Sequence, residues 1–278
     1  MKTPAYSVLV NGVPESRLAV ADRGLQYGDG LFETLAIRQG RPRFWDRHMT
    51  RLRDGCARLQ IPAPDPVQMA EDAARLYAGI PNAVLKIIHT RGAGTRGYRP
   101  ADSPVPTTIM QCLPDPDYPA EFAKNGIPVR ICRMRLAHNP VLAGIKHLNR
   151  LEQVLARSEW NDDAIPEGLM ADLNGNLIEG TMSNVFLVQG GVLLTPDLAR
   201  CGVAGIMREV LLELSADNGI ASAVRDVTLD ELRAADELFV CSSLAGIWPV
   251  VRCDAYQYGI GPLTGKLQQL LGELQDNG

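Results

Sequence analysis

The sequence predicts an α+β fold of two lobes, and three observations lead to this prediction. A chain of 278 residues, 46% of them hydrophobic, is long enough for two hydrophobic cores around a cleft. Strand–turn–strand patterns alternate with helical patterns in both halves of the chain. A proline-bearing stretch near the middle is typical of a connector. We therefore expect a small lobe over residues 1–113, a connector over 114–128 and a larger lobe over 129–278.

The first lobe begins with two predicted hairpins. Residues 7–17 form a strand, an Asn11-Gly12 turn and a second strand, which is a strong short-range hairpin pattern. The same device recurs with strands at 31–37 and 43–45 around Gln39-Gly40. Asp46 is the expected N-cap of a helix over 47–59, whose apolar residues recur at helical spacing. A second helix is predicted over 67–77, with strands over 83–89 and 107–112.

The larger lobe is predicted to mix hairpins with helices. It begins with a strand over 129–134 and an amphipathic helix over 148–160. Two hairpins follow, over 168–178 with a turn at Asn174-Gly175 and over 185–194 with a turn at Gly190-Gly191. The remaining predictions are a helix over 205–218 closed by Gly219, a helix over 229–234, a strand over 237–241 and a helix over 263–274.

Charge and composition disfavour several classes of partner. The net charge is −4 with both signs mixed along the chain, so we expect neither nucleic acid nor a membrane surface as a partner. No apolar run approaches the ~20 residues of a membrane-spanning helix, and the first residues lack a signal-peptide core. The six cysteines are scattered and the four histidines lack metal-ligand spacing. We expect a cytoplasmic protein with reduced thiols and no metal site.

Lys146 is the strongest candidate for a reactive group. It follows Ala-Gly-Ile, small and apolar residues, and it is one of five lysines among 28 basic residues. An ammonium that loses hydration becomes a nucleophilic amine near neutral pH, which is the requirement for Schiff-base chemistry. The alternative is a lysine at a helix entry whose stem lies along the core while its head stays in water. The local pattern supports both interpretations equally.

Glu179 is the second candidate, within Leu177-Ile-Glu-Gly-Thr-Met-Ser-Asn184. Its carboxylate interrupts a predicted hairpin strand at a Gly-Thr corner. A pyridine ring that accepts electrons needs a proton on its nitrogen, and a buried carboxylate facing that nitrogen holds the proton there. The alternative is a turn carboxylate that accepts hydrogen bonds from nearby backbone amides.

Three features are suited to binding a phosphate. Arg51 lies on the first predicted helix, and a guanidinium group binds phosphate through two parallel hydrogen bonds. The amides at the helix start Gly205-Ile206-Met207 form an intrinsic anion site. Ser242 and Ser243, after a predicted strand, add hydroxyl donors. Each feature has an ordinary structural explanation when it is taken alone.

A glycine pattern at residues 92–97 matches the dinucleotide-binding motif but predicts no such site. The residues that follow, Tyr98-Arg-Pro100 and then Pro104, cannot begin the helix that would hold a pyrophosphate. We expect a mobile loop that carries arginines. Arg91, Arg96 and Arg99 on this loop are candidates to meet an anionic substrate or are simply solvated charge.

Taken together, these segments resemble the fold-type IV pyridoxal-phosphate enzymes, a family of aminotransferases and lyases. The resemblance runs from Asp22-Arg-Gly-Leu-Gln-Tyr-Gly to Trp248-Pro-Val250, through the Lys146, Glu179 and Gly205 segments. It implies a homodimer with pyridoxal 5'-phosphate held between a small and a large lobe. It also implies a role for each candidate residue: Lys146 forms the Schiff base, Glu179 pairs with the pyridine nitrogen, and Arg51, the amides of Ile206 and Met207, and Ser243 hold the phosphate.

Within this family the Lys146 segment and the Arg91 loop are most similar to those of the lyases. Aminotransferases of this fold typically place a different residue where Arg150 stands. The resemblance therefore implies a lyase that releases pyruvate from a dianionic substrate, with Arg96 as the first candidate for its carboxylates, Arg91 as the second and Arg150 in support. The alternatives are a D-amino-acid or branched-chain aminotransferase, a non-catalytic protein that binds the cofactor, and a cofactor-independent Schiff-base aldolase.

Overall fold

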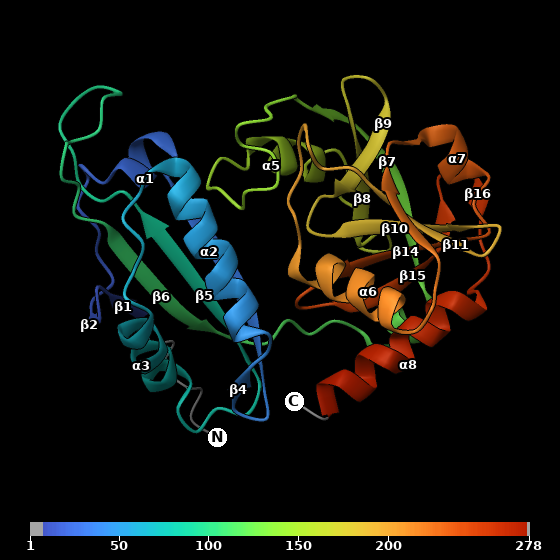
Figure 1. The fold of residues 1–278 in the computed structure, drawn as a ribbon, viewed down its shortest axis with the longest axis horizontal. Coiled ribbons are helices and arrows are strands. Elements are labelled where there is room, and N and C mark those ends of the chain that lie inside the picture. The colour runs from blue at the N-terminus through green and yellow to red at the C-terminus, as the bar shows by residue number, and fades with distance from the viewer. Residues whose placement is uncertain (1–7, 277–278) are drawn as a thin grey trace. The chain divides into compact units, whose positions relative to one another are not determined.

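A computed structural model describes residues 8–276 and divides the chain into two compact units. Unit 1 comprises residues 1–117 and 145–149, and unit 2 comprises residues 118–144 and 150–278. The chain thus passes from one unit to the other three times, and the short segment 145–149 that carries Lys146 belongs to unit 1. Elements of both units can be located in Figure 1, where they are labelled as far as there is room. The predicted α+β class is confirmed by this mixture of helices and sheets.

Unit 1 is built on an antiparallel sheet of six strands in the order β2-β1-β6-β5-β3-β4. The strands are β1 (Val8–Val10), β2 (Val13–Pro14), β3 (Gly30–Arg38), β4 (Arg41–Pro42), β5 (Ala83–Thr90) and β6 (Thr107–Leu113). The helices are α1 (Arg23–Tyr27), α2 (Trp45–Leu59) and α3 (Pro66–Tyr77). The Asn11-Gly12 turn lies between β1 and β2 as predicted, with φ of 50° and 76° at its two residues. Ser7, the first residue of that predicted hairpin, lies outside the described residues.

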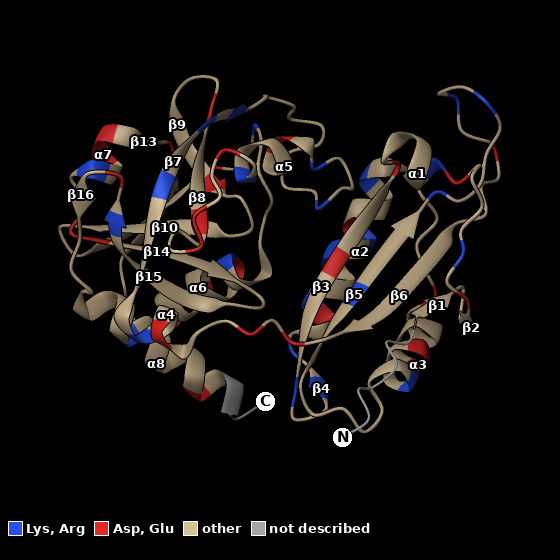
Figure 2. Ribbon diagram, turned by 180° about the vertical axis from the view of Figure 1, so that it is seen from behind, with Lys and Arg blue, Asp and Glu red and all other residues tan. Residues whose placement is uncertain are grey.

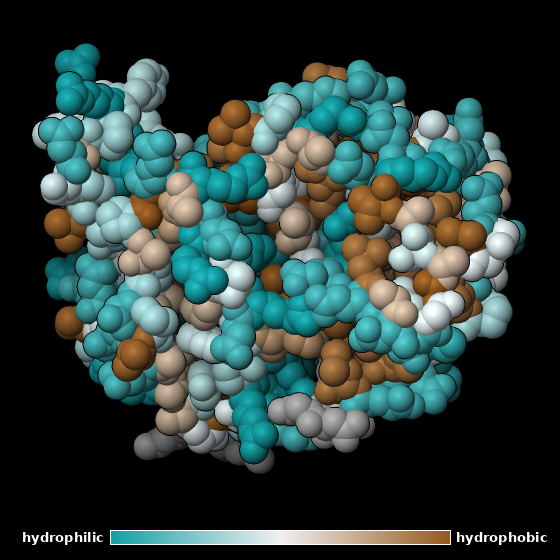
Figure 3. Space-filling model, viewed as in Figure 1, coloured by the Kyte–Doolittle hydropathy of each residue, from teal (hydrophilic) through white to brown (hydrophobic). Residues whose placement is uncertain are grey.

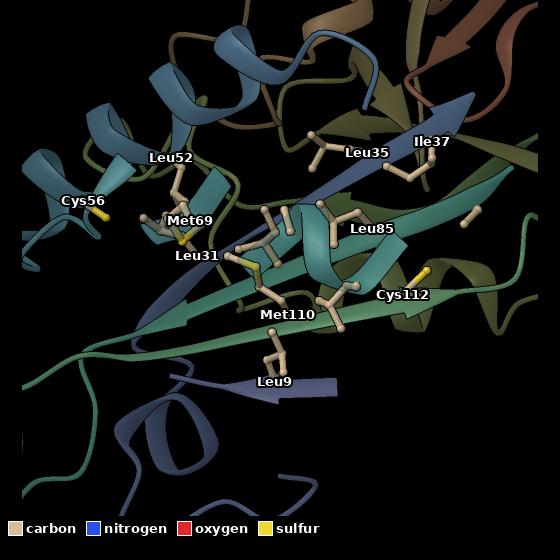
Figure 4. Packing of buried hydrophobic residues seen from close by; sticks show 14 of the residues in the cluster. Leu9, Leu31, Leu35, Ile37, Leu52, Cys56, Met69, Leu85, Met110 and Cys112 are labelled. Atoms are coloured by element: carbon tan, nitrogen blue, oxygen red, sulfur yellow. The ribbon is translucent and has the colours of Figure 1, made fainter. Parts of the chain in front are cut away.

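The core of unit 1 lies between its sheet and helices α2 and α3. Alternate residues of β3, among them Leu31 and Leu35, pack with Leu52 and Cys56 of α2 and with Met69 of α3 (Figure 4). This alternation is the pleat of a strand with one face on the core. Glu33 occupies the same face of β3, so a carboxylate stands at a position where the pattern calls for an apolar side chain.

Two details of unit 1 differ from the prediction. Helix α2 begins at Trp45 after Phe44, so Asp46 lies in the first turn and the N-cap prediction was wrong. The expected return strand over 43–45 is replaced by the short β4, because the chain enters the helix at once. An acidic residue in the first turn still favours the helix through the helix dipole.

Unit 2 contains a mixed sheet in the order β12-β11-β10-β14-β15-β7-β8-β9-β13, with β16 paired to β15. Its strands are β7 (Ile127–Leu136), β8 (Glu167–Asp172), β9 (Asn176–Gly180), β10 (Asn184–Gln189), β11 (Val192–Pro196), β12 (Ser222–Arg225), β13 (Val227–Thr228), β14 (Glu237–Ser242), β15 (Gly246–Cys253) and β16 (Tyr256–Gln257). Its helices are α4 (Ala120–Asn125), α5 (Leu151–Arg157), α6 (Ile206–Asp217), α7 (Leu229–Arg233) and α8 (Pro262–Asp276). Both predicted hairpins turn where expected, at Asn174-Gly175 and at Gly190-Gly191.

The segments around Lys146 and the expected connector differ most from the prediction. The predicted helix over 148–160 is confined to Leu151–Arg157. Residues 114–128 were expected as a connector but include α4 and the start of β7. Pro119 stands at the N-cap of α4, where the missing amide hydrogen costs no helical bond. Within residues 8–276, no helix has the length and apolar character that crossing a membrane would require.

Candidate active site

Lys146 lies in an extended segment that hydrogen bonding holds at both ends. Before it, Gly144 donates to the Gly202 carbonyl at 2.9 Å and accepts from the Ala204 amide at 3.1 Å. At the lysine itself, the Phe32 amide donates to the Lys146 carbonyl at 3.0 Å. Helix α5 begins five positions later, so the lysine does not stand at a helix entry. The Lys146 Nζ lies 4.3 Å from the centre of the Phe32 ring, whose face attracts a cation.

Arg51 belongs to a buried ionic cluster in unit 1. Its Nε donates to Glu33 Oε1 at 2.8 Å and its Nη2 donates to Glu33 Oε2. His48 Nδ1 lies 2.6 Å from the same Oε2 atom. The acidic position of β3 and the basic positions of α2 can be followed in Figure 2. His48 and Arg51 come from adjacent turns of α2, so one face of this helix supplies both partners of the carboxylate.

The charges in this cluster follow from burial and partners. Burial alone raises the pKa of Glu33, but hydrogen bonds from His48 and Arg51 outweigh it and hold that pKa below its usual range. Burial lowers the pKa of His48, and the charges of Arg51 and Lys146 lower it further against the effect of Glu33. A neutral His48 therefore donates its Nδ1 hydrogen to an ionised Glu33. The charge of Lys146 acts on His48, which connects the lysine to the Arg51 cluster within unit 1.

Glu179 lies at the end of β9 and is only 4% exposed. Its Oε2 accepts from the Val203 amide at 2.8 Å, and its Oε1 accepts from Gln153 Nε2 at 3.1 Å. Val203 comes immediately after Gly202, which binds Gly144 of the lysine segment. The alternative of a carboxylate that only caps nearby turn amides does not describe this geometry, because both of these donors are more than twenty residues away in the chain.

The turn after Glu179 is held by a residue that sequence reasoning missed. Glu167 is fully buried on β8 and accepts hydrogen bonds from the amide and hydroxyl of Thr181 and from the hydroxyl of Ser183. Gly180 fits because an added Cβ would lie 2.2 Å from Ser183 Oγ. A glutamate within a strand that is otherwise buried was the available signal, since a buried carboxylate needs several donors.

The start of α6 follows directly from the segment that binds Glu179. Asn184 Nδ2 donates to the Val203 carbonyl at 2.9 Å, and a Cβ on Gly205 would lie 2.0 Å from Asn184 Oδ1. Gly205 is the N-cap of α6, and a residue with a side chain at this position would clash with Asn184. Ile206 and Met207 are buried, and the N-cap residue Gly205 has no side chain with which to cap the helix start. An N-terminus of this kind presents unsatisfied amides to an anion.

Ser243 follows β14, which pairs with the strand that begins at Asn184. The register places Cys241 opposite Asn184, so the end of β14 lies beside the start of β10. Ser243 is half-buried, and Ser242 Oγ accepts from the Ala245 amide at 3.2 Å. Within unit 2, the structure thus brings Glu179, the start of α6 and the turn at Ser242-Ser243 close together.

The arginines of the loop after β5 have different environments. Arg91 is 8% exposed; its Nε and Nη2 donate to Asp29, and its Nη1 donates to the Gln60 carbonyl at 2.7 Å. Its Nη2 also donates to the Leu59 carbonyl at 2.7 Å. Arg96 is exposed, on a loop whose surface is mostly hydrophilic (Figure 3). The geometry therefore favours a structural role for Arg91 and leaves Arg96 as the candidate for a substrate carboxylate.

Arg150 immediately precedes α5 in unit 2. Burial lowers the pKa of its guanidinium, while the charges of Glu179 and Glu152 act in the opposite direction. The charge of Glu179 is thus felt at Arg150, which lies three residues before Gln153. Arg150 belongs with the Glu179 group rather than with the loop arginines.

The residues present fit pyridoxal phosphate on two observations. The uncapped start of α6 offers backbone amides, the donors that a phosphate group accepts. Glu179 is a buried carboxylate held by the neutral donors Gln153 and Val203, which favour its charged form. A carboxylate of this kind is what a protonated pyridine nitrogen requires.

The two-unit fold, the segment that carries Lys146 and the buried Glu179 together point to one protein family. Residues 30–253 match the model of the amino-transferase class IV family. The chain belongs to this family, which confirms the resemblance seen in the sequence. The match covers both candidate residues on which the Schiff-base and pyridine predictions rest, Lys146 and Glu179.

Individual relatives include both lyases and aminotransferases. The chain is 36% identical to an aminodeoxychorismate lyase of Vibrio harveyi over 263 residues, covering 93% of this chain and 97% of the relative. It is 30% identical to a putative branched-chain-amino-acid aminotransferase of Methanocaldococcus jannaschii, covering 94% and 92%.

Among solved structures, the 4-amino-4-deoxychorismate lyase of Pseudomonas aeruginosa is similar with a TM-score of 0.92 and 49% identity, covering 96% of this chain and 98% of that one. The branched-chain aminotransferase of Escherichia coli reaches a TM-score of 0.85 at 26% identity, covering 97% and 94%.

Proposed function

We propose that the protein is a 4-amino-4-deoxychorismate lyase that uses pyridoxal 5'-phosphate. It converts aminodeoxychorismate to para-aminobenzoate and pyruvate, a step of folate biosynthesis. The observation that carries this proposal is the 49% identity to the Pseudomonas aeruginosa lyase over nearly the full length of both chains. The similarity to aminotransferases is much lower, at 26% to 30% identity.

When bound, the cofactor supplies an aldehyde for covalent attachment and a pyridine ring that accepts electrons. Lys146 Nζ would be the atom that holds the aldehyde. As a neutral amine, Lys146 would take the proton from the substrate ring carbon that bears nitrogen. The same amine would return a proton as the enolpyruvyl oxygen leaves, so one residue would act as anchor, base and acid.

The other residues bind and orient. Glu179 holds the proton on the pyridine nitrogen, while the amides of Ile206 and Met207, Ser243 and Arg51 bind the phosphate. Arg51 is already fixed by Glu33, so its guanidinium group is pre-oriented before a ligand arrives. Arg96 meets a substrate carboxylate, with Arg150 as a supporting charge.

The test begins with the purified protein. We expect a visible absorption band from bound cofactor, and pyruvate and para-aminobenzoate in equal amounts when aminodeoxychorismate is added without a keto acid. An aminotransferase would instead convert its cofactor to the amine form on addition of a D- or branched-chain amino acid. A protein that merely binds the cofactor would show the band and neither reaction. A colourless protein would favour the cofactor-independent aldolase.

Replacement of Lys146 by alanine is the decisive variant. We expect the loss of the covalent absorption band together with a fall in turnover of at least about 10²–10⁴-fold, the usual contribution of acid–base catalysis. Lys86, on β5 of unit 1, is a matched control because K86A removes a lysine that has no assigned role in the site. A K146A protein that keeps both the band and turnover would refute the assignment.

We further propose a homodimer in the cytoplasm. Leu151, Val154 and Leu155 share one side of α5 at helical spacing and are 74%, 56% and 56% exposed, as expected for a face that a second copy covers. All six cysteines are free and buried, which fits a reducing compartment. Sedimentation should give twice the chain mass, and Leu155→Asp should shift it toward a monomer. Sedimentation of the unsubstituted protein as a monomer would contradict the dimer.

A further inference from the structure

We infer that Gln153 is a positioning residue that holds Glu179 as a carboxylate for the pyridine nitrogen. This inference rests on the proposed function, because it assigns a task within the same site. Sequence reasoning attached no role to Gln153, which lies in the first turn of α5. Its contact with Glu179 joins two segments 26 residues apart in the chain.

The first observation is the identity of the two donors described for Glu179. Oε1 receives the side-chain amide of Gln153, and Oε2 receives the backbone amide of Val203. Both of these donors are neutral, so each favours the ionised carboxylate without adding a charge of its own. The charge of Arg150, the residue before α5, also acts on Glu179. Gln153 therefore contributes a directed hydrogen bond that orients the carboxylate, rather than a charge.

The second observation is the other end of the same amide. Gln153 Oε1 is buried and accepts no hydrogen bond among the described residues. An unsatisfied buried acceptor is unfavourable for folding, so stability alone gives no reason for glutamine at this position. The orientation is nevertheless determined, because turning the amide would place Oε1 against the carboxylate oxygen. The one hydrogen bond described for the Gln153 side-chain amide is therefore the one that it donates to Glu179.

The third observation is the chain connection to Lys146. Gly144, two residues before the lysine, binds Gly202 and Ala204, which flank the Val203 donor. Gln153 lies seven residues after the lysine. Gly144 and Gln153, which both belong to unit 2, thus stand on either side of the short segment that carries Lys146, and each lies next to or provides a donor of Glu179.

Two variants test the inference against a purely structural role. Gln153→Leu keeps the size of the side chain and removes the donor. We expect kcat to fall about 10- to 100-fold, the range for losing one hydrogen bond to a charged group, with KM nearly unchanged. We expect the visible band to persist with an altered pH profile, and the melting temperature of the cofactor-free protein to change little.

Gln153→Glu provides a pH-dependent rescue within a single protein. At low pH its protonated carboxyl group donates to Glu179 as the amide did, whereas at high pH two carboxylates face each other. The kcat relative to the unsubstituted enzyme should therefore decrease as pH rises, and so should the melting temperature of the cofactor-free variant. Gln153→Leu should show no such trend relative to the unsubstituted enzyme, because leucine does not titrate.

Gln268 provides the matched control. Its side-chain amide donates to the carbonyls of Ala123 and Ile247 in unit 2 and has no role in the proposed site. Gln268→Leu should lower the melting temperature and leave the pH profile of the band unchanged. If both Gln153 variants keep the kcat and pH profiles of the unsubstituted enzyme, the inference is wrong. If the unsubstituted protein shows the band but releases no pyruvate, the lyase proposal fails, and the band profiles of the variants still decide the role of Gln153.

Discussion

The buried glutamates of the two units are satisfied in different ways. In unit 1, Glu33 is bound by Arg51 and His48, and the half-buried Asp29 is likewise bound by arginines, Arg23 and Arg91. In unit 2, the hydrogen bonds described for three buried glutamates come from neutral groups. Amides and hydroxyls bind Glu167, the start of α8 binds Glu237, and an amide side chain and a backbone amide bind Glu179.

This difference distinguishes carboxylates that are neutralised inside the fold from carboxylates whose charge can still act on a ligand. A guanidinium partner neutralises the carboxylate and makes the pair costly to break. Neutral donors stabilise the negative charge and leave its field in place. Glu167 receives hydrogen bonds from three consecutive residues of one turn. Among the three, Glu179 is the one whose described donors come from helix α5 and from the segment before α6, the two segments that the proposed cofactor site uses.

The sharpest test of the comparison replaces each of two glutamates by glutamine. Glu179→Gln should reduce turnover by about 10²–10³-fold, as expected when a preorganised electrostatic group is lost, and should leave the fold nearly as stable. Glu33→Gln should instead lower the free energy of unfolding by about 3–5 kcal/mol, because it removes the ionised partner of the buried Arg51 guanidinium. Denaturant unfolding of both variants beside a turnover assay checks this. Equal losses of stability would contradict the separation.

Elements of the fold that depend on residues close together in the sequence could be predicted, and elements that depend on distant residues could not. The hairpins at Asn11-Gly12 and Asn174-Gly175 were found because the turn residues themselves determine the local backbone. Strand β15 was missed because Pro249 lies within it, and proline argues against a strand when neighbouring strands are unknown. Helix α5 was predicted to cover 148–160 but covers only Leu151–Arg157. The apolar pattern that predicted it extends past both ends of the hydrogen-bonded helix.

The candidate site shows the same limit. Lys146 and Glu179 were identifiable because their chemistry is unusual for their local surroundings. Their partners were not, since Gln153 lies 26 residues from Glu179, and Glu33 lies 18 residues from Arg51. Glu33 also breaks the apolar alternation of β3, a signal that sequence reasoning could have used. Only the pairing of distant segments identifies the partner that satisfies such a residue.

The loop arginines extend the comparison to cations. Arg91→Gln should lower the free energy of unfolding by about 3 kcal/mol, because it removes a buried guanidinium that binds Asp29 together with Arg23 and that is a donor to two carbonyls. Arg96→Gln should leave stability unchanged and raise KM about tenfold, as expected for one charged contact to substrate. Thermal unfolding and steady-state kinetics of the two variants separate these outcomes. A large rise in KM for Arg91→Gln at unchanged stability would restore Arg91 as a substrate ligand.

The smallest expected effect is a pH dependence that originates in unit 1. The pKa of His48 is lowered in the folded protein, chiefly by burial, so the unfolded chain binds a proton that the folded chain resists. The contribution of His48 to stability is therefore complete above the ordinary histidine pKa of about 6.5 and is lost as pH falls toward the depressed value. Glu33, whose pKa is also lowered, adds a loss of stability at more acidic pH.

Melting temperatures between pH 8 and pH 5 should therefore fall more steeply for the unsubstituted protein than for His48→Gln. Parallel curves for the unsubstituted protein and His48→Gln would mean that His48 takes up a proton in the folded state as easily as in the unfolded chain, and the neutral donor assigned to Glu33 would then be wrong.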